Sequence, residues 1–316
     1  MEIKKNFLSY LVFFLTCLFQ YKTQAAETIA LAGPIGGTDI GSAFLPPSGN
    51  YIAGIGAAIK NQKWYDNDGK QSDVKGAVYI GGVGLLHVYK TQLYGGSLAS
   101  SVFLGYQELC FGFDTKECVS GFRDVYSDLI TWSKFYPTKE KDPSHIPYGL
   151  AITTGLGVNF PLGAYKEGNS LNVGSNFYTI SPNIGITYTF ESFLPSVFGE
   201  ATELSSRLAY NYYTKNEATD YVTGPVLNMD YAITQRKEKW QYGITGTTYK
   251  QLRDDKVQGH YIKDTEAKTL TMGPLVAYNL KVDKKTYNVM LKLPMNVWGE
   301  NNLECIGATL RVSTSF

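Results

Sequence analysis

The sequence lacks the long apolar runs, the excess of one charge and the helical periodicity that several common protein classes require. Its 29 lysines and arginines balance 28 aspartates and glutamates, giving a formal net charge of +1. These charges are scattered rather than striped, so we expect no nucleic acid as a partner. Beyond residue 25 no stretch approaches the roughly 20 apolar residues that a membrane-spanning helix needs. No period of 3.6 residues is sustained, so the pattern favours strands over helices.

Histidines are scarce, which weighs against an enzyme. A Ser-His or Cys-His hydrolase needs a histidine within hydrogen-bonding reach of its nucleophile. Of the three histidines, His87 has no serine nearby on its own face, and His145 and His260 lie in polar connections. The barrel hydrolases carry a His-x-Ser element, which is absent here. Residues 81–84 are glycine-rich but precede no helical pattern, so we expect neither catalysis nor a nucleotide or other cofactor.

Only four cysteines are present, and none combines with histidine at a metal-ligand spacing, so we expect no metal site. Cys17 lies in the N-terminal apolar segment. Cys110 and Cys118 flank a short segment, which in an oxidising compartment indicates a disulfide closing a loop between two strands. Chance spacing is the alternative. Cys305 remains as a small residue at the start of the last strand.

The first 25 residues have the pattern of an export signal. Lys4 and Lys5 form a basic start, residues 7–19 form a mostly apolar run, and Thr23-Gln24-Ala25 supplies a small-x-small cleavage pattern. The apolar run is too short to span a bilayer as a helix. We therefore divide the chain into a signal peptide (1–25), an irregular lead-in segment (26–50) and a β domain (51–316).

The last segment of the sequence alternates strictly between two kinds of side chain. One face carries Ile306, Ala308, Leu310, Val312, Thr314 and Phe316, and the other carries Arg311, Ser313 and Ser315. A strand with lipid outside and water inside requires this period of two. A soluble edge strand can show the same alternation. The terminal Phe316 resembles the sorting signal that outer-membrane barrels present to the barrel-assembly machinery.

Similar alternation recurs along the chain, which is rich in tyrosine (24), phenylalanine (16) and glycine (32). The aromatic residues concentrate near the ends of these segments, as in the girdles at membrane interfaces. We predict an all-β, antiparallel, up-and-down transmembrane barrel of about 12 strands. A secreted β-sandwich shares the composition and is the alternative. The predicted strands cover residues 51–61, 75–88, 97–107, 123–133, 148–160, 177–190, 202–213, 221–234, 240–252, 269–280, 285–294 and 304–316.

Four prolines lie inside these predicted strands. A proline cannot donate to a ladder, so each is expected at a bulge or a strand end. The four are Pro182, Pro225, Pro274 and Pro294.

Polar residues that alternate with the apolar face are expected to line the lumen. An interior lattice of salt bridges that only stabilises the barrel is one interpretation, and contact with a solute is the other. A 12-stranded barrel lies between filled barrels of 8 strands and open channels of 16 to 18, so the bore should admit only small molecules. The candidate lumen residues are Lys60, Arg207, Asn211, Asn228, Asp230, Lys292 and Arg311.

Several sequence patches together resemble one known family. The clearest has the pattern P-x-G-x-Y and then N-x-G-x-N followed by aromatics, threonine and proline. Its members are Pro161, Gly163, Tyr165, Asn172, Gly174, Asn176 and Pro182. The stretch is similar to the family named for the meta pathway of phenol degradation, which overlaps the SphA-like outer-membrane proteins. The family commonly has Gly-Asp before a Trp-containing strand, where this chain has Ser127-Asp128 and then Trp132.

The resemblance implies a barrel in the bacterial outer membrane that moves small hydrophobic or aromatic molecules. We therefore expect a porin-like channel or diffusion transporter whose partners are outer-membrane lipid, the barrel-assembly machinery and a small solute. A structural barrel whose surface loops bind a partner is the alternative, and a membrane hydrolase is a weaker one. The family name reflects association with a pathway and implies no reaction.

Overall fold

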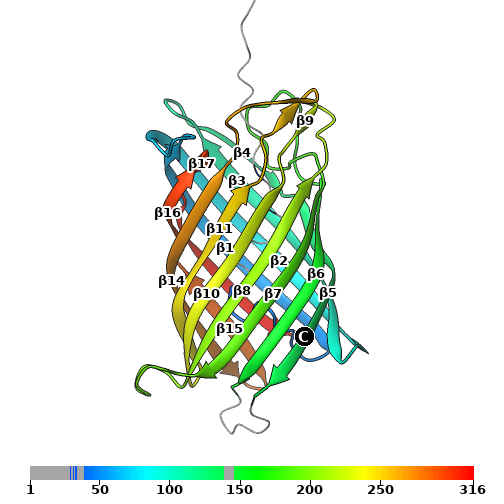
Figure 1. Ribbon diagram of the computed structural model, residues 1–316, viewed down its shortest axis with the longest axis vertical. Helices are drawn as coiled ribbons and strands as arrows, with labels where there is room; N and C mark the ends of the chain where they lie inside the picture. Colours follow the sequence, from blue (N-terminus) through cyan, green and yellow to red (C-terminus); the bar gives the residue numbers. More distant parts are fainter. Residues whose placement is uncertain (1–28, 30, 32, 34–38, 139–145) are drawn as a thin grey trace, which may run out of the picture.

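The computed structural model of the chain describes residues 29, 31, 33, 39–138 and 146–316. Its regular elements are all β-strands, which form a closed antiparallel barrel (Figure 1). Closure occurs where β1 (Gly49–Tyr65) pairs on one side with β2 (Gln71–Leu93) and on the other with β18 (Ile306–Ser315). The wall runs from β2 through β3 (Gly96–Phe111), β5 (Val125–Pro137), β6 (Gly149–Phe160), β7 (Thr179–Glu191), β8 (Ala201–Tyr213), β10 (Val226–Lys237), β11 (Trp240–Gln251), β14 (Lys268–Val282) and β15 (Lys285–Lys292) to β18.

Short strands extend or cover this wall. β4 (Glu117–Phe122) pairs with the C-terminal part of β3. β16 (Met295–Glu300) follows β15 and pairs with β14, and β17 (Asn302–Leu303) pairs with the C-terminal end of β1. β9 (Tyr221–Val222), β12 (Lys256–Val257) and β13 (His260–Tyr261) form a separate small sheet. Within the described residues, no helix is long and apolar enough to cross a membrane.

The two ends of the barrel differ in their connections. At one end, which we call the turn end, the β2–β3, β10–β11 and β14–β15 connections have only two residues each. Tyr94 and Gly95 both have positive φ there, as tight hairpins require. At the other end, the loop end, residues 161–178, 214–225 and 252–267 form long connections that include the small sheet. In Figure 1 the loop end is at the top and the C-terminus lies at the bottom.

Side chains are distributed in the reverse of a soluble protein. Along β7, Thr187 is fully buried while its neighbours Ile186 and Tyr188 are 49% and 41% exposed. β10 and β11 repeat this, with Asp230 inside and Ile233 and Ile244 outside. An apolar exterior with a polar interior is the arrangement that lipid selects. The predicted all-β barrel of 12 strands is therefore confirmed.

The strand predictions differ from the structure mainly near their ends. The predicted strand 221–234 begins only at Val226, because Tyr221 instead bridges Asn216 and joins the small sheet. The predicted strand 285–294 ends at Lys292. The signal segment 1–25 lies outside the described residues.

The prolines follow the expectation only in part. Pro225 precedes β10, and Pro294 lies in the break between β15 and β16. Pro274 and Pro182 instead lie within continuous strands, so the prediction was wrong for them. At Pro274 the pairing of β14 changes from β16 to β15. At Pro182 the β7–β8 ladder is interrupted, and it resumes in the same register at Asn183. Both β14 and β7 therefore continue past their proline.

Candidate functional site in the barrel interior

The interior wall has a polar side and an apolar side. Strands β7, β8, β10 and β11 present hydroxyl, amide and charged groups inward, including Thr187, Asn228 and Thr245. Strands β1 and β2 present apolar groups such as Ile55 and Leu86 to the same interior. The barrel therefore encloses two chemically different surfaces that face one another.

A segment that precedes the first strand lies against the polar side. In this inner segment, defined as residues 39–48, the Gly41 amide donates to Glu203 Oε1 at 2.7 Å. The Ala43 amide donates to Thr187 Oγ1 at 3.1 Å. Ile40 packs on the buried cluster of Leu275, Ala277 and Met290. The sequence predicted an irregular lead-in over 26–50, but gave no sign that its end lies inside the barrel.

The inner segment is also fixed by a buried ion pair. Asp39 Oδ2 accepts hydrogen bonds from Lys292 Nζ and from Thr245 Oγ1, both at 2.8 Å. Asp39 is fully buried and Lys292 is 4% exposed. A buried charge needs a partner and further hydrogen bonds to offset its desolvation. The arrangement ties residue 39 to the late strands β11 and β15.

Between the inner segment and the apolar side lies an interior chamber of about 570 Å³. Its apolar wall includes Tyr51, Ile55, Leu86 and Phe103, and residues 40–46 form the opposite boundary. This volume lies within the usual range of about 300–1,000 Å³ for small-molecule sites. The chamber is therefore large enough for a single small solute.

One polar cluster reaches the chamber and is satisfied largely within itself. Asp128 Oδ1 accepts from Arg207 Nη2 at 2.6 Å and from the Tyr126 hydroxyl at 2.7 Å. Its Oδ2 accepts from Ser101 Oγ at 3.1 Å, and Arg207 Nε donates to Asn183 Oδ1 at 3.1 Å. Because these groups already bond one another, an apolar solute can occupy the chamber without breaking their hydrogen bonds.

The structure places six of the seven candidate lumen residues on the interior face. Arg207 and Arg311 line the chamber. Asn211 donates to Asn228 at 2.7 Å, Asp230 accepts from Thr247 at 2.6 Å, and Lys292 binds Asp39. These contacts are those of an interior hydrogen-bonded lattice, with the two arginines also facing the chamber.

Lys60 lies on the outer face, so its assignment to the lumen was wrong. It pairs with Ile306, an outward residue, and its side chain is exposed. The rule that polar residues face inward fails on β1 because this strand lines the apolar side of the chamber. Its inward residues include Ala53 and Ile55.

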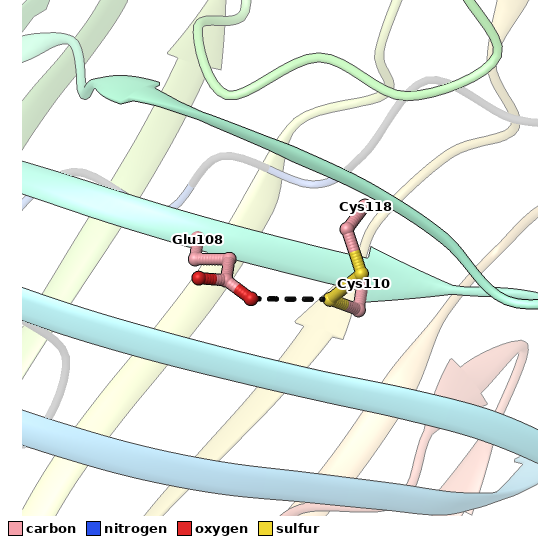
Figure 2. Close-up of a disulfide and its surroundings, with 3 residues drawn as sticks. All are labelled: Glu108, Cys110 and Cys118. Carbon is pink, nitrogen blue, oxygen red and sulfur yellow. Dashed lines mark hydrogen bonds between the residues drawn. A yellow bond between two sulfur atoms is a disulfide. The ribbon is translucent and has the colours of Figure 1, made fainter.

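Cys110 and Cys118 are joined by a disulfide between β3 and β4 at the loop end (Figure 2). The two residues lie directly opposite one another in the β3–β4 ladder. Glu108 Oε1 lies 3.6 Å from Cys110 Sγ, which is a contact rather than a hydrogen bond because a disulfide sulfur carries no proton. Both sulfurs are bonded to each other, so they do not offer thiolates to a metal.

The family-motif residues build loops rather than a solute site. Asp124 accepts hydrogen bonds from the amides of Gly163 and Ser175, both at 2.9 Å. A Cβ on Gly174 would lie 2.7 Å from the backbone carbon of Gly163, so only glycine allows the two segments to approach this closely. Asn172 bonds both the amide and the carbonyl of Lys166.

A second group of motif residues joins neighbouring connections. Asn216 accepts from Asn176 Nδ2 at 2.7 Å and donates to the Tyr165 hydroxyl at 3.2 Å. Pro161 begins the same connection, and Pro182 lies within β7. The conspicuous sequence motif therefore covers the loop end. Sequence reasoning missed Phe103 and Tyr126 at the chamber and Asp39, which anchors the inner segment, because each is isolated in sequence. Asp128 was noted only as part of the Ser-Asp departure from the family pattern.

The histidines do not form a catalytic group among the described residues. His87 Nδ1 lies 2.7 Å from Asn50 Oδ1, and its ring packs edge-on to Tyr89. His260 is exposed in the small sheet, and His145 lies outside the described residues. Phe316 lies at the turn end, where its amide donates to the Asn50 carbonyl at 3.0 Å.

Comparisons with known proteins identify a family and a shared fold. The sequence profile of the family described as "Putative MetA-pathway of phenol degradation" matches residues 60–312. The chain resembles the COG4313 outer membrane channel from Pseudomonas putida F1, with a TM-score of 0.72 and 16% identity, over 88% of this chain and 99% of that one. At this identity the likeness shows a shared fold.

Two autotransporter barrels are more distant. The transport unit of AIDA-I from Escherichia coli is 14% identical, with a TM-score of 0.46 over 85% of this chain and 90% of that one. The beta domain of Bordetella BrkA is 10% identical, with a TM-score of 0.44 over 85% and 98%. No curated protein matches the chain in sequence.

Proposed function

The chain belongs to the family described as "Putative MetA-pathway of phenol degradation", and we propose that it is an outer-membrane channel for small hydrophobic or aromatic compounds. The observation that carries this proposal is the chamber of about 570 Å³ beside the inner segment. Its apolar wall provides a surface against which a monoaromatic solute gains free energy by leaving water.

The family and the fold support a location in the outer membrane. The barrel exposes isoleucine, leucine and aromatic side chains around its wall, which only lipid would cover favourably. The COG4313 channel, which has the same fold, is an outer membrane channel by its description. We place the loop end outside the cell and the turn end in the periplasm. Phe316 is proposed as the signal for the barrel-assembly machinery.

The interior favours small solutes over large ones. The inner segment and its anchors at Glu203, Thr187 and Lys292 occupy the polar side of the lumen. The chamber beside them is bounded by Leu86 and Phe103 on one side and Arg207 on the other. A solute with an apolar ring matches this space, and passage rather than catalysis is the activity proposed.

Uptake in cells tests the proposal. Cells lacking this chain would be given a radiolabelled monoaromatic compound at low concentration, and accumulation would be compared with cells that carry it. We expect faster accumulation with the wild-type chain. Purified protein in liposomes, tested with sugars of graded size, should pass only the smallest. Unchanged uptake of every apolar solute, together with rapid flux of large sugars, would show a general porin instead.

A further inference from the structure

The connection between β7 and β8, residues 192–200, lies on the outside of the barrel wall at the turn end. Ser192 Oγ donates to Gln235 Oε1 at 2.9 Å, and Gln235 Nε2 donates to Thr202 Oγ1 at 2.8 Å. Gln235 and Thr202 lie on the outer face, yet they are 8% and 0% exposed. Their outward neighbours Ile233 and Leu204 are 54% and 40% exposed. The connection therefore folds outward and covers these two polar side chains.

The outer wall holds this connection in a defined shape. The Tyr242 hydroxyl donates to the Phe198 carbonyl, and Lys237 Nζ donates to the Val197 carbonyl at 2.6 Å. The Glu200 amide donates to the Arg236 carbonyl at 2.8 Å. In Figure 1 the green connection projects sideways at the lower end of the barrel.

The side chains that this connection exposes are apolar. Phe193, Val197 and Phe198 are 71%, 63% and 56% exposed, and no charged residue lies between Glu191 and Glu200. Three large apolar groups in one short turn form a patch of the kind that marks an interaction site. The outer wall beside it carries Trp240 and Tyr278, whose rings lie 4.5 Å apart.

Aromatic residues of this kind gather where a bilayer meets water. We infer that residues 193–198 form a lipid anchor, whose apolar side chains enter the border of the acyl chains in the periplasmic leaflet. The inference rests on the proposed placement of the barrel in a membrane. Residues 193–198 would then attach the protein to the lipid at a second place, beside the lipid-facing wall of the barrel.

The charges around the anchor indicate which lipids it takes. Lys237 and Lys239 are offset by Glu191, Glu200 and Glu238 in the adjoining strand ends and turn. Lys237 also already bonds the Val197 carbonyl. Attachment should therefore depend on acyl chains and differ little between zwitterionic and anionic headgroups.

Fluorescence quenching by lipid-borne spin labels tests the anchor. In a Cys305→Ser background, Val197→Cys would be labelled with a small environment-sensitive fluorophore, since Cys110 and Cys118 are already bonded. The matched control is Lys284→Cys, an exposed polar position in the β14–β15 turn at the same end. Both proteins would be reconstituted at high lipid-to-protein ratio in phosphatidylcholine vesicles that contain lipids with a doxyl group on an upper acyl carbon.

We expect at least about twofold stronger doxyl quenching at position 197 than at position 284, because an interfacial segment lies about 5–10 Å inside the headgroup boundary. The ratio should be unchanged when phosphatidylglycerol replaces part of the lipid. Equal quenching at both positions, with position 197 open to aqueous iodide, would overturn the anchor. Position 197 shielded from both quenchers would point to a protein partner or a second copy and would also overturn it.

Two further measurements keep the outcomes separate. Labelling at Phe193→Cys repeats the test if the first variant fails to fold, as judged by gel mobility with and without heating. Solute flux through the same vesicles tests the channel independently. Normal flux without lipid quenching contradicts the anchor alone, whereas lipid quenching without flux or apolar uptake contradicts the channel alone.

Discussion

Asp39 of the inner segment binds Lys292 of β15 inside the barrel, with 2.8 Å between Oδ2 and Nζ. The two residues lie 253 positions apart in the sequence. The bond connects the segment before the first strand to one of the last strands of the wall. It thereby fixes the position of the inner segment, which forms one side of the chamber.

Replacing Asp39 with Asn should loosen the inner segment. Removing one partner of a buried ion pair costs about 3–5 kcal/mol, so we expect a lower midpoint of thermal unfolding and a larger single-channel conductance. Circular dichroism and planar-bilayer recording measure the two effects. The control is Lys63→Gln, which removes the exposed Lys63–Asp73 pair and should change neither. Wild-type conductance in the Asp39→Asn variant would contradict the assigned role.

The Arg207–Asp128 pair allows a double-mutant cycle. Arg207→Gln and Asp128→Asn should each lower stability, and the double variant should lose less than the sum of the two single losses. We expect a coupling energy of about 0.5–3 kcal/mol, as for residues in direct contact. Denaturant unfolding of the four proteins in the same detergent measures it. Strictly additive losses would show that the 2.6 Å contact contributes nothing specific.

The apolar wall of the chamber should determine which solutes pass. Leu86→Gln places an amide at that wall, and contact between an amide and an apolar solute costs about 1–3 kcal/mol. We expect accumulation of a labelled monoaromatic compound to fall roughly tenfold, with little change for a small sugar. Leu86→Met keeps the volume and the polarity and serves as the control. An equal fall for both solutes would indicate a general obstruction of the lumen.

The glycine motif at the loop end should be structural. Gly174→Ala puts a methyl group 2.7 Å from the backbone carbon of Gly163, so the 161–178 connection must move and should become sensitive to protease. Asn169→Ala, at an exposed position of the same connection, should remain resistant. Mass spectrometry of the fragments identifies the cleavage sites. Equal resistance of the two variants would contradict the close packing.

Asp255 should make the loop end sensitive to pH. Burial raises the pKa of its carboxyl, while hydrogen bonds from Tyr221, Gly224 and Gln251 lower it in part. The folded loop therefore holds the proton more firmly than the unfolded chain does. This contribution to stability is present below the unfolded pKa and is lost as pH rises through the folded value. Hydrogen exchange of residues 252–267, corrected for intrinsic rates, should slow on acidification in the wild type.

Asp255→Asn is the matched control for that experiment. It keeps the size of the side chain and cannot titrate, so the pH dependence of exchange in residues 252–267 should flatten. An identical pH profile in the two proteins would show that Asp255 is not the source of the pH dependence.

The strands could be predicted because lipid imposes one rule over the whole wall. Ile180, Ile184 and Ile186 face outward and Ser181, Asn183 and Thr187 inward, so a period of two is visible in the sequence alone. Lys60 breaks the rule. The inward side of β1 faces an apolar chamber rather than water, and polarity then no longer identifies the inner face.

The chamber could not be predicted in the same way. Its boundary depends on where residues 39–48 lie, and their partners come from β7, β8, β11 and β15. No local sequence pattern predicts such contacts, because each partner is a single threonine, glutamate or lysine in a strand that otherwise follows the same alternation as its neighbours. The motif that is visible in the sequence instead reflects the tight packing of loops around Asp124 and Asn216.

The pairing of β1 with β18 closes the barrel around the inner segment. Ten residue pairs join these strands, from Tyr51–Ser315 to Lys60–Ile306, and they can form only when both strands are in place. The inner segment is continuous with β1 and lies within the cylinder that this pairing closes. The obstruction of this channel is therefore covalently joined to the strand that closes the barrel, so it cannot leave the protein as a separate plug domain could.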